Sequence, residues 1–331
     1  MRPILHPTLI NGRTGDPALY IETLFERRAI LFDLGDIANL PARKIHRLEH
    51  IFVSHAHIDH FIGFDHLLRI LVGRPKTIKL YGPEGFIDHV RHKLLAYRWN
   101  LAGYFSTDLV IYAAEIISAH EIKTARFRLR NAFAVEPSGD ARLTGGCLHD
   151  EPLFRVLTAT LEHRTPCLAF AVEESAHVNV WKNRLEQLGL PVGPWLRRLK
   201  QAVIDNAPDH TPIEVGDGNT RRLGELRGTV TVTRGQKIGY VTDAADTPAN
   251  RQAIVRLVQN ADLLFIEAAF AAADRVLAAE RAHLTTVAAG EIARAAGVRR
   301  VEPFHFSPRY AGKEDYLLRE VQASFSGGSM P

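Results

Sequence analysis

Cysteine is scarce in this sequence of 331 residues. The two that occur, Cys147 and Cys167, form neither a CxxC pair nor the spacing pattern of a disulfide framework. Small proteins of oxidising compartments often depend on several disulfides, whereas reduced thiols are usual elsewhere. The sequence therefore predicts a reducing compartment, and we expect a cytoplasmic location.

Long apolar runs are missing as well. No stretch reaches the roughly 18 consecutive apolar residues that a membrane-spanning helix requires. Near the N-terminus, Pro3 and Pro7 interrupt the segment where a signal peptide would need an unbroken apolar region. We expect no membrane partner.

Charge of one sign is only weakly in excess. The 41 Lys and Arg residues against 37 Asp and Glu residues give a formal net charge of +4. This balance is compatible with a polyanionic partner but does not require one. The hydrophobic fraction of 46% and the charged fraction of 24% are ordinary for a globular protein, and the length provides ample core.

Histidine and aspartate, in contrast, are concentrated in one short segment. The apolar run 51–53 is followed by His55, His57, Asp59 and His60. In an extended segment the first two histidines project to the same side, and a turn returns the other two residues toward them. Imidazole nitrogens and carboxylate oxygens suit zinc, iron or manganese. Together with ligands from distant parts of the chain, the segment can form a compact dinuclear metal site; a histidine-rich surface loop is the alternative, but it gives no reason for ligands to follow a buried strand.

Three further candidate ligands come directly after apolar strands. They are His163, Asp243 and His305, and the strands are predicted over 154–161, 237–242 and 298–303. An α/β fold gathers functional groups along one edge of its sheets, so we expect these side chains to join the first cluster. For His163, an isolated histidine without a ligand role is the alternative.

Other elements follow from periodicity and turn residues. Strands are expected over 18–22, 29–32, 78–81, 167–172 and 262–270, and helices over 61–71, 86–95 and 286–296. The segment 137–140 is expected to be a turn, and Cys147 and His149 are interpreted as lone surface positions rather than a metal pair.

Several of these segments resemble a known family. Residues 55–60 are similar to the HxHxDH signature of the metallo-β-lactamase superfamily, and later segments resemble its ribonuclease Z branch. Residues 81–85 resemble its YGPxG turn, 282–286 its HST motif and 305–310 its HFSxRY motif. The resemblance extends from about residue 19 to 310. It implies an α/β fold, the four-layer αββα metallo-β-lactamase sandwich, formed as a single domain over 1–331.

The resemblance also implies a site. One metal ion would be held by His55, His57 and His163, a second by Asp59, His60 and His305, with Asp243 bridging and Asp33 orienting a ligating histidine. Two divalent ions about 3.5–4 Å apart, zinc by default with manganese or iron as alternatives, lower the pKa of a shared water. The implied catalytic residues are Asp59 and His283, the latter paired with Glu267 to protonate the leaving oxygen.

The function implied is a dinuclear-metal hydrolase of phosphodiesters, specifically a 3′ processing endoribonuclease that acts on a tRNA precursor. A hydrolase of a smaller phosphodiester or other ester is the alternative. A non-catalytic metal-binding scaffold is a third hypothesis, which the unbroken ligand set argues against. Members of the branch tend to dimerise, so a homodimer is expected.

Residues 173–222 shift to a polar, Gly- and Pro-containing composition and are expected to form an arm-like insertion. The segment 188–200 resembles the part of the branch at the base of an arm that grips the tRNA elbow. Trp195 with Arg197, Arg198 and Lys200 suits base stacking and phosphate contact, although a solvated basic helix face explains the same residues.

The chain departs from the branch at three places. No glycine-rich FLGTG opening precedes residue 18, the GDTR motif is replaced by Thr242-Asp243-Ala244-Ala245, and Ile266 occupies the histidine position of HEATF. We therefore expect an intact hydrolytic centre with altered substrate-binding features.

Overall fold

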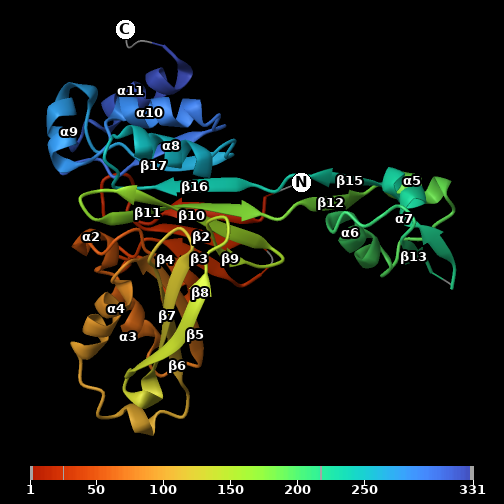
Figure 1. Cartoon of the computed structure of the whole chain (residues 1–331), viewed down its shortest axis with the longest axis horizontal. Helices are drawn as coiled ribbons and strands as arrows, with labels where there is room; N and C mark the ends of the chain where they lie inside the picture. The colour runs from red at the N-terminus through yellow and green to blue at the C-terminus, as the bar shows by residue number, and fades with distance from the viewer. Residues whose placement is uncertain (1–2, 25, 217, 329–331) are drawn as a thin grey trace. The chain divides into compact units, whose positions relative to one another are not determined.

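The computed structural model describes residues 3–24, 26–216 and 218–328. The chain divides into two compact units. The main unit comprises residues 1–173 and 236–331, and the inserted unit comprises residues 174–235. Figure 1 shows the layers of the main unit with most of its helices and strands labelled.

Among the described residues, strands β1 to β8 form an eight-stranded mixed sheet whose spatial order follows the sequence. The pairs β3–β4, β4–β5 and β5–β6 are parallel, and the remaining pairs are antiparallel. The strands are β1 (Leu5–Leu9), β2 (Leu19–Thr23), β3 (Ala29–Phe32), β4 (Leu48–Phe52), β5 (Lys76–Pro83), β6 (Leu109–Ile116), β7 (Glu121–Arg128) and β8 (Val135–Arg142).

A second sheet has the order β18-β17-β16-β11-β10-β9. Strands β16, β17 and β18 are parallel, and β11 is antiparallel to β16. The strands are β9 (Cys147–Asp150), β10 (Phe154–Glu162), β11 (Pro166–Glu174), β16 (Lys237–Val241), β17 (Leu263–Glu267) and β18 (Val301–Phe304).

The two sheets pack face to face through aromatic side chains. Phe32 of the first sheet stacks on Phe170 and Tyr240 of the second, with ring centroids 5.3 and 5.5 Å apart, and all three are fully buried. Aromatic residues bury about 150–250 Å² each and so dominate the energy of such a core. The contact therefore holds together the sheet ends from which the candidate ligands emerge.

Helices cover the outer faces of both sheets. Those on the first sheet are α1 (Ala42–Ile45), α2 (Ile58–Phe61), α3 (Phe64–Leu71) and α4 (Phe86–Leu95), and those on the second are α8 (Pro248–Leu257), α9 (Arg275–Arg281), α10 (Thr286–Ala295) and α11 (Glu314–Ser326). The predicted αββα sandwich is confirmed. Among the described residues, no helix has both the length and the apolarity needed to cross a lipid bilayer.

Two sequence-based expectations for local structure were wrong. Residues 137–140 lie inside β8 rather than in a turn, because β8 is an edge strand that tolerates a proline, and Gly139 accommodates an irregular register at φ +105°. The helix expected over 61–71 is broken before α3. A Cβ at Gly63 would lie 2.1 Å from the carbonyl oxygen of Gly35, so this close approach needs glycine.

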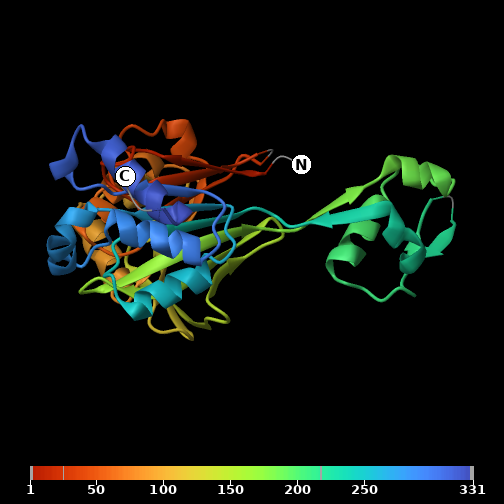
Figure 2. The ribbon, with the colours of Figure 1, turned by 90° about the horizontal axis from the view of Figure 1, so that it is seen from above.

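The inserted unit has its own core, which includes Trp195, Leu199 and Leu223. Its elements are β12 (His177–Val180), α5 (Lys182–Gln187), α6 (Leu196–Ile204), β13 (Pro212–Glu214), β14 (Thr220–Arg222), α7 (Leu223–Leu226) and β15 (Val230–Thr233). Strand β12 pairs with β15 and β13 pairs with β14, both antiparallel (Figure 2). The sequence-based range 173–222 overlaps this unit, which continues to Gly235.

Trp195 is not available for the base stacking expected from the sequence. Its side chain is 8% exposed, and its Nε1 donates a hydrogen bond to the carbonyl oxygen of Pro191 at 2.9 Å. The exposed aromatic residue of this unit is instead Trp181, which is 46% exposed and carries the guanidinium of Arg184 over its ring.

The insertion begins and ends at neighbouring positions of the second sheet. Glu173 of β11 lies opposite Lys237 of β16 in the antiparallel register. Their side chains form an ion pair at 3.0 Å. The two main-unit strands are thus already paired in register at the point where the chain enters and leaves the inserted unit.

Candidate metal centre

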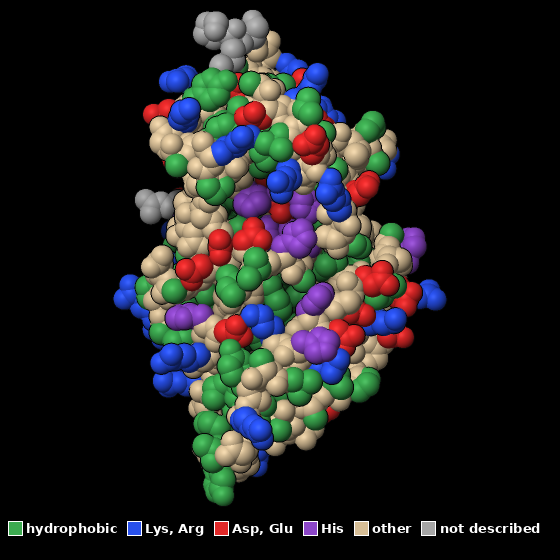
Figure 3. All heavy atoms as spheres, turned by 90° about the vertical axis from the view of Figure 1, so that its left-hand side faces the viewer, with side chains coloured by type: hydrophobic (Ala, Val, Ile, Leu, Met, Phe, Trp, Pro, Cys, Tyr) green, Lys and Arg blue, Asp and Glu red, His purple; other side chains and the backbone are tan. Residues whose placement is uncertain are grey.

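All seven candidate ligands lie together where strands of both sheets end. The ligand atoms of His55, His57, His163 and Asp243 are within 4.8 Å of one another, and the same holds for the group of Asp59, His60 and His305. The first segment follows β4, and the others follow β10, β16 and β18. Figure 3 shows histidine side chains gathered with acidic ones in a hollow on one face.

The Asp243 carboxylate lies at the centre of the cluster and is 2% exposed. Its Oδ2 is 3.5 Å from His55 Nε2, 3.3 Å from His60 Nε2 and 3.4 Å from His163 Nε2. Its Oδ1 is 2.8 Å from His305 Nδ1. Four imidazole nitrogens, two from the segment after β4 and one each from the segments after β10 and β18, therefore face one buried carboxylate.

Three of these nitrogens are buried without a hydrogen bond of suitable geometry to any described residue. They are Nε2 of His55, Nε2 of His60 and Nδ1 of His305. Buried polar atoms of native proteins nearly always have a partner, and nitrogens that converge on a carboxylate are the donor set that a divalent cation satisfies. The histidine and aspartate clusters are thus suited to binding metal.

The opposite sides of the ligand rings are held by the protein. Asp33 Oδ2 lies 2.8 Å from His60 Nδ1 and accepts hydrogen bonds from Ser54 Oγ at 2.9 Å and Tyr240 Oη at 2.8 Å. His163 Nδ1 lies 2.8 Å from the carbonyl oxygen of Ala282. Such contacts fix ring orientation and turn the other nitrogen toward the centre. Asp33 occupies the orienting position expected from the sequence, whereas Tyr240 looked like an ordinary strand residue.

Charge and burial set the protonation states around Asp243. Burial lowers the pKa of His55 to about 2, so this ring is neutral and able to act as a ligand. Burial also opposes a proton on His305, but the negative charge of Asp243 outweighs it and raises the pKa of His305 to about 10. Burial opposes ionisation of Asp243 too, yet His305 and His60 hold its pKa well below the usual range. A cation bound here would replace those protons, so its binding depends on pH.

A histidine–glutamate pair lies beside the cluster. His283 Nδ1 is 2.8 Å from Glu267 Oε2 and 3.9 Å from Asp243 Oδ1. The Glu267 side chain is fully buried and also accepts a hydrogen bond from the backbone N–H of Ala244 at 2.6 Å. Burial opposes a proton on His283, but the carboxylate of Glu267 outweighs it and raises the pKa of the imidazole.

The cluster opens into a cavity of about 800 Å³. Besides the predicted residues, its lining includes Arg164, Arg281 and Arg309. Sequence reasoning named none of these arginines as a site residue. Arg309 lies in the segment 305–310 that resembles the HFSxRY motif, and Arg164 and Arg281 stand within two positions of His163 and His283; these were the available signals.

A separate histidine group lies between the sheets, and its one carboxylate already has charged and polar partners. His50 packs on His149 with ring centroids 4.0 Å apart, and Glu151 lies 3.2 Å from His149 Nε2. Both oxygens of Glu151 also accept hydrogen bonds from Arg28, at 2.9 and 2.8 Å. The expectation that His149 and Cys147 are lone surface positions was wrong, since both are half-buried and Cys147 Sγ donates to the carbonyl oxygen of His149.

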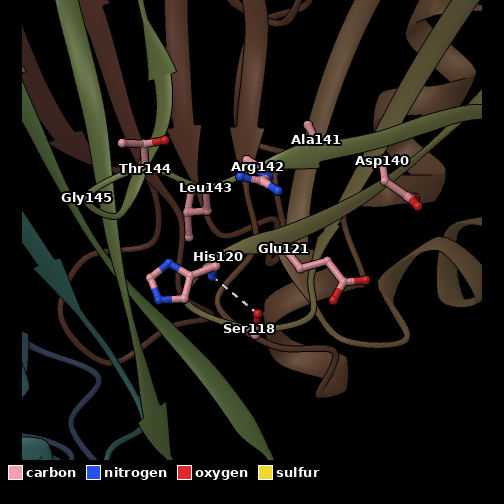
Figure 4. A pocket seen from close by; sticks show the side chains of 9 residues that line it. All are labelled: Ser118, His120, Glu121, Asp140, Ala141, Arg142, Leu143, Thr144 and Gly145. Carbon is pink, nitrogen blue, oxygen red and sulfur yellow. Dashed lines mark hydrogen bonds between the residues drawn. The ribbon is translucent and has the colours of Figure 1, made fainter.

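Another hollow lies at the ends of β7 and β8 and is shown in Figure 4. His120 donates a backbone hydrogen bond to Ser118 Oγ at 3.2 Å. The His120 ring and the carboxylates of Glu121 and Asp140 point in different directions, so they do not converge on one ligand position (Figure 4).

Comparison with known proteins supports the geometric interpretation. A family model described as a beta-lactamase superfamily domain matches residues 21–182 and 192–306. A Deinococcus radiodurans protein named Ribonuclease Z is 30% identical over 330 residues, which cover 97% of this chain and 96% of that protein. A Trichodesmium erythraeum protein of the same name is 32% identical over 296 residues, with 87% and 77% covered.

A solved structure, the short form of human tRNase Z, resembles the chain in fold. The TM-score is 0.52 at 19% sequence identity, and the match covers 93% of this chain and 92% of that one. The likeness therefore extends over nearly the full length of both chains.

Replacement of Asp33 by asparagine tests the outer support of the cluster. Asparagine keeps the size and tolerates the left-handed backbone at φ +57°, but it removes the charge that faces His60. We expect Asp33→Asn to weaken divalent metal binding by about 10- to 100-fold in a chelator competition assay. Asp65→Asn is the control, because Asp65 pairs with Lys93 away from the cluster. Equal affinities for both variants would contradict the orienting role of Asp33.

Proposed function

Because the chain belongs to the beta-lactamase superfamily and, within it, to the ribonuclease Z family, we propose that it is a metal-dependent endoribonuclease that processes the 3′ ends of tRNA precursors. The observation that carries this proposal is the convergence of seven histidine and aspartate residues in one cluster, five of which line one cavity, beside the pair of His283 and Glu267. The relatives do not favour the alternative of a smaller phosphodiester or other ester substrate.

Two divalent metal ions fit the cluster. His55, His57 and His163 would hold one, Asp59, His60 and His305 the other, and the Asp243 carboxylate lies between the two groups. When bound, such ions supply an activated water and neutralise charge that builds on a phosphoryl oxygen. Zinc is the proposed metal because it suits imidazole and carboxylate ligands, with manganese or iron as alternatives.

His283 is positioned to deliver a proton. Its Nδ1 is held by Glu267, which leaves Nε2 to donate to the ribose oxygen that departs from phosphorus. The buried carboxylate of Glu267 favours the protonated imidazole and fixes its orientation. We propose a positioning role for Glu267 and a direct catalytic role for His283.

The inserted unit is proposed to bind the RNA backbone. Arg197 and Lys200 of α6 are exposed and form no ion pair with any residue in the described part of the chain, whereas Arg198 pairs with Glu214 at 3.1 Å. Unpaired cations on a rigid helix suit phosphate contacts, and the exposed ring of Trp181 suits a base or ribose.

A cytoplasmic location and assembly as a homodimer complete the proposal. The location is supported by the small number of cysteines and by the tRNA-processing relatives. The homodimer is supported by the resemblance to the branch, whose members tend to dimerise.

The central test compares two substrates with one metal-loaded preparation. We expect the protein to cleave a 3′-extended tRNA precursor and, more slowly, bis-p-nitrophenyl phosphate. Asp59→Asn removes a proposed ligand and should reduce both activities by at least about 100-fold, whereas Asp65→Asn should retain them. Hydrolysis of the ester without cleavage of the precursor would favour the alternative substrate. Loss of neither activity in Asp59→Asn would contradict the proposed centre.

The role of His283 is tested through the leaving group. We expect His283→Ala to lower kcat on the tRNA precursor by about 10²- to 10⁴-fold while metal content stays unchanged. Because p-nitrophenolate departs without a proton, the loss on bis-p-nitrophenyl phosphate should be far smaller. His120→Ala, in an exposed turn elsewhere on the main unit, is the control. Loss of metal from His283→Ala would instead indicate a ligand or structural role.

The inserted unit can be removed without changing the register of the second sheet. Residues 175–235 are replaced by an Asn-Gly turn, because Glu173 and Lys237 already pair in the antiparallel register. We expect the ratio of kcat/KM on the tRNA precursor to that on the small ester to fall by at least about 100-fold.

A milder variant keeps the unit folded. Arg197→Ala combined with Lys200→Ala should flatten the dependence of log affinity on log salt concentration by roughly 0.7–0.9 per lost phosphate contact. Arg221→Ala, whose arginine pairs with Glu225, is the control. An unchanged substrate ratio and an unchanged salt slope together would show that the unit does not bind the RNA.

A further inference from the structure

Arginines from three separate segments line the cavity that contains the candidate metal centre. Arg164 follows His163 directly, Arg281 ends α9, and Arg309 lies beyond β18. All three are exposed, and the cavity of about 800 Å³ has room for considerably more than one phosphodiester group. Positively charged side chains therefore line this cavity in addition to the candidate metal ligands.

Two of these arginines have no acidic partner in the part of the chain that the structure describes. Among the residues that the structure describes, no carboxylate forms an ion pair with Arg164 or Arg281, whereas Arg309 reaches Asp274 at 3.6 Å and lies over the ring of Tyr310. An unpaired guanidinium at the mouth of a cavity is available for an anion and matches the oxygens of a phosphate in a two-pronged contact.

The backbone fixes these two arginines beside the cluster. The side chain of Arg164 donates to the carbonyl oxygen of Glu280, and His163 Nδ1 lies 2.8 Å from the carbonyl oxygen of Ala282. These contacts tie the segment after β10 to the end of α9, on either side of Arg281. Both Arg164 and Ala282 have positive φ, at 54° and 57°, which is costly for such residues and persists only where the surroundings enforce it.

We infer that Arg281, with Arg164 beside it, binds the phosphate adjacent to the one that is cleaved. This inference rests on the proposed function and deepens it, because it makes a second consecutive phosphodiester a requirement for efficient turnover. Both guanidinium groups line the same cavity, so an anion bound there is attracted to both. The rim therefore discriminates a polynucleotide from an isolated diester by charge rather than by base sequence.

The test uses short substrates, so that the inserted unit plays no part in it. Wild-type protein, Arg281→Ala, Arg281→Lys and Arg164→Lys are compared on single-stranded ribonucleotides with one or two phosphodiesters and on bis-p-nitrophenyl phosphate. Arg319→Ala is the matched control, since Arg319 is an exposed arginine of α11 that lines a different hollow.

The expected result is a change of ratio. In Arg281→Ala, kcat/KM on the two-diester substrate relative to bis-p-nitrophenyl phosphate should fall by about 10- to 100-fold, mainly through KM. Arg281→Lys should recover part of this loss, and Arg319→Ala should show none. A neutral methylphosphonate at the linkage next to the cleaved one should lower kcat/KM of the wild-type protein by the same factor. In Arg281→Ala the same replacement should lower kcat/KM little further.

Two outcomes would overturn the inference. One is a methylphosphonate at the flanking linkage that lowers kcat/KM by the same factor in the wild-type protein and in Arg281→Ala. The other is a wild-type protein that turns over one-diester and two-diester substrates with the same KM. Failure to cleave the tRNA precursor would overturn the proposed function alone, because the short substrates would still report the effect of the arginines.

Discussion

The structure depends on one buried carboxylate. Asp243 has no lysine or arginine within ion-pair distance among the described residues, and all of its ionic contacts are to histidines. Removing a charge from water costs several kcal/mol unless strong local interactions offset it. The ring of imidazoles supplies that compensation, and a bound cation would supply it more completely. The outer carboxylates of Asp33 and Glu267 then balance the imidazoles, so charge alternates outward from the centre.

Backbone geometry at the ends of strands places these charges. Asp33, Asp243 and His305 lie immediately or almost immediately beyond β3, β16 and β18, and each has a positive φ, between 46° and 57°. Aspartate and histidine tolerate this conformation better than most residues. The reversed backbone turns each side chain back over the end of its own sheet. The aromatic core between the sheets keeps those strand ends together. Packing away from the candidate metal centre therefore sets the distances between its ligands.

The sequence was most informative where ligand chemistry and strand ends coincide. Two patterns predicted which side chains meet. One is the density of ligands in 55–60, and the other is the apolar strand that precedes each of His163, Asp243 and His305. The fold was predicted through the resemblance of these motifs to the metallo-β-lactamase superfamily. Other contacts and exposures could not be predicted from the sequence, for physical reasons. Tyr240 reaches Asp33 across the two sheets, a contact that no local pattern encodes. Trp195 carries the same sequence signal whether it is buried or exposed, and in β8 a proline and a glycine that suggest a turn are tolerated because the strand is an edge.

The position of the insertion has a consequence for how the chain reaches its fold. β11 and β16 are neighbours in space but are separated along the chain by the whole inserted unit, so pairing them closes a long loop. Closure entropy grows by about 0.6 kcal/mol for each doubling of loop length. A unit that has already folded, with β12 paired to β15, brings its two ends together and shortens the effective loop about sixteenfold, which lowers the cost of closure by about 2 kcal/mol. Folding of the insertion before the second sheet therefore speeds completion of the sheet whose edge carries Asp243.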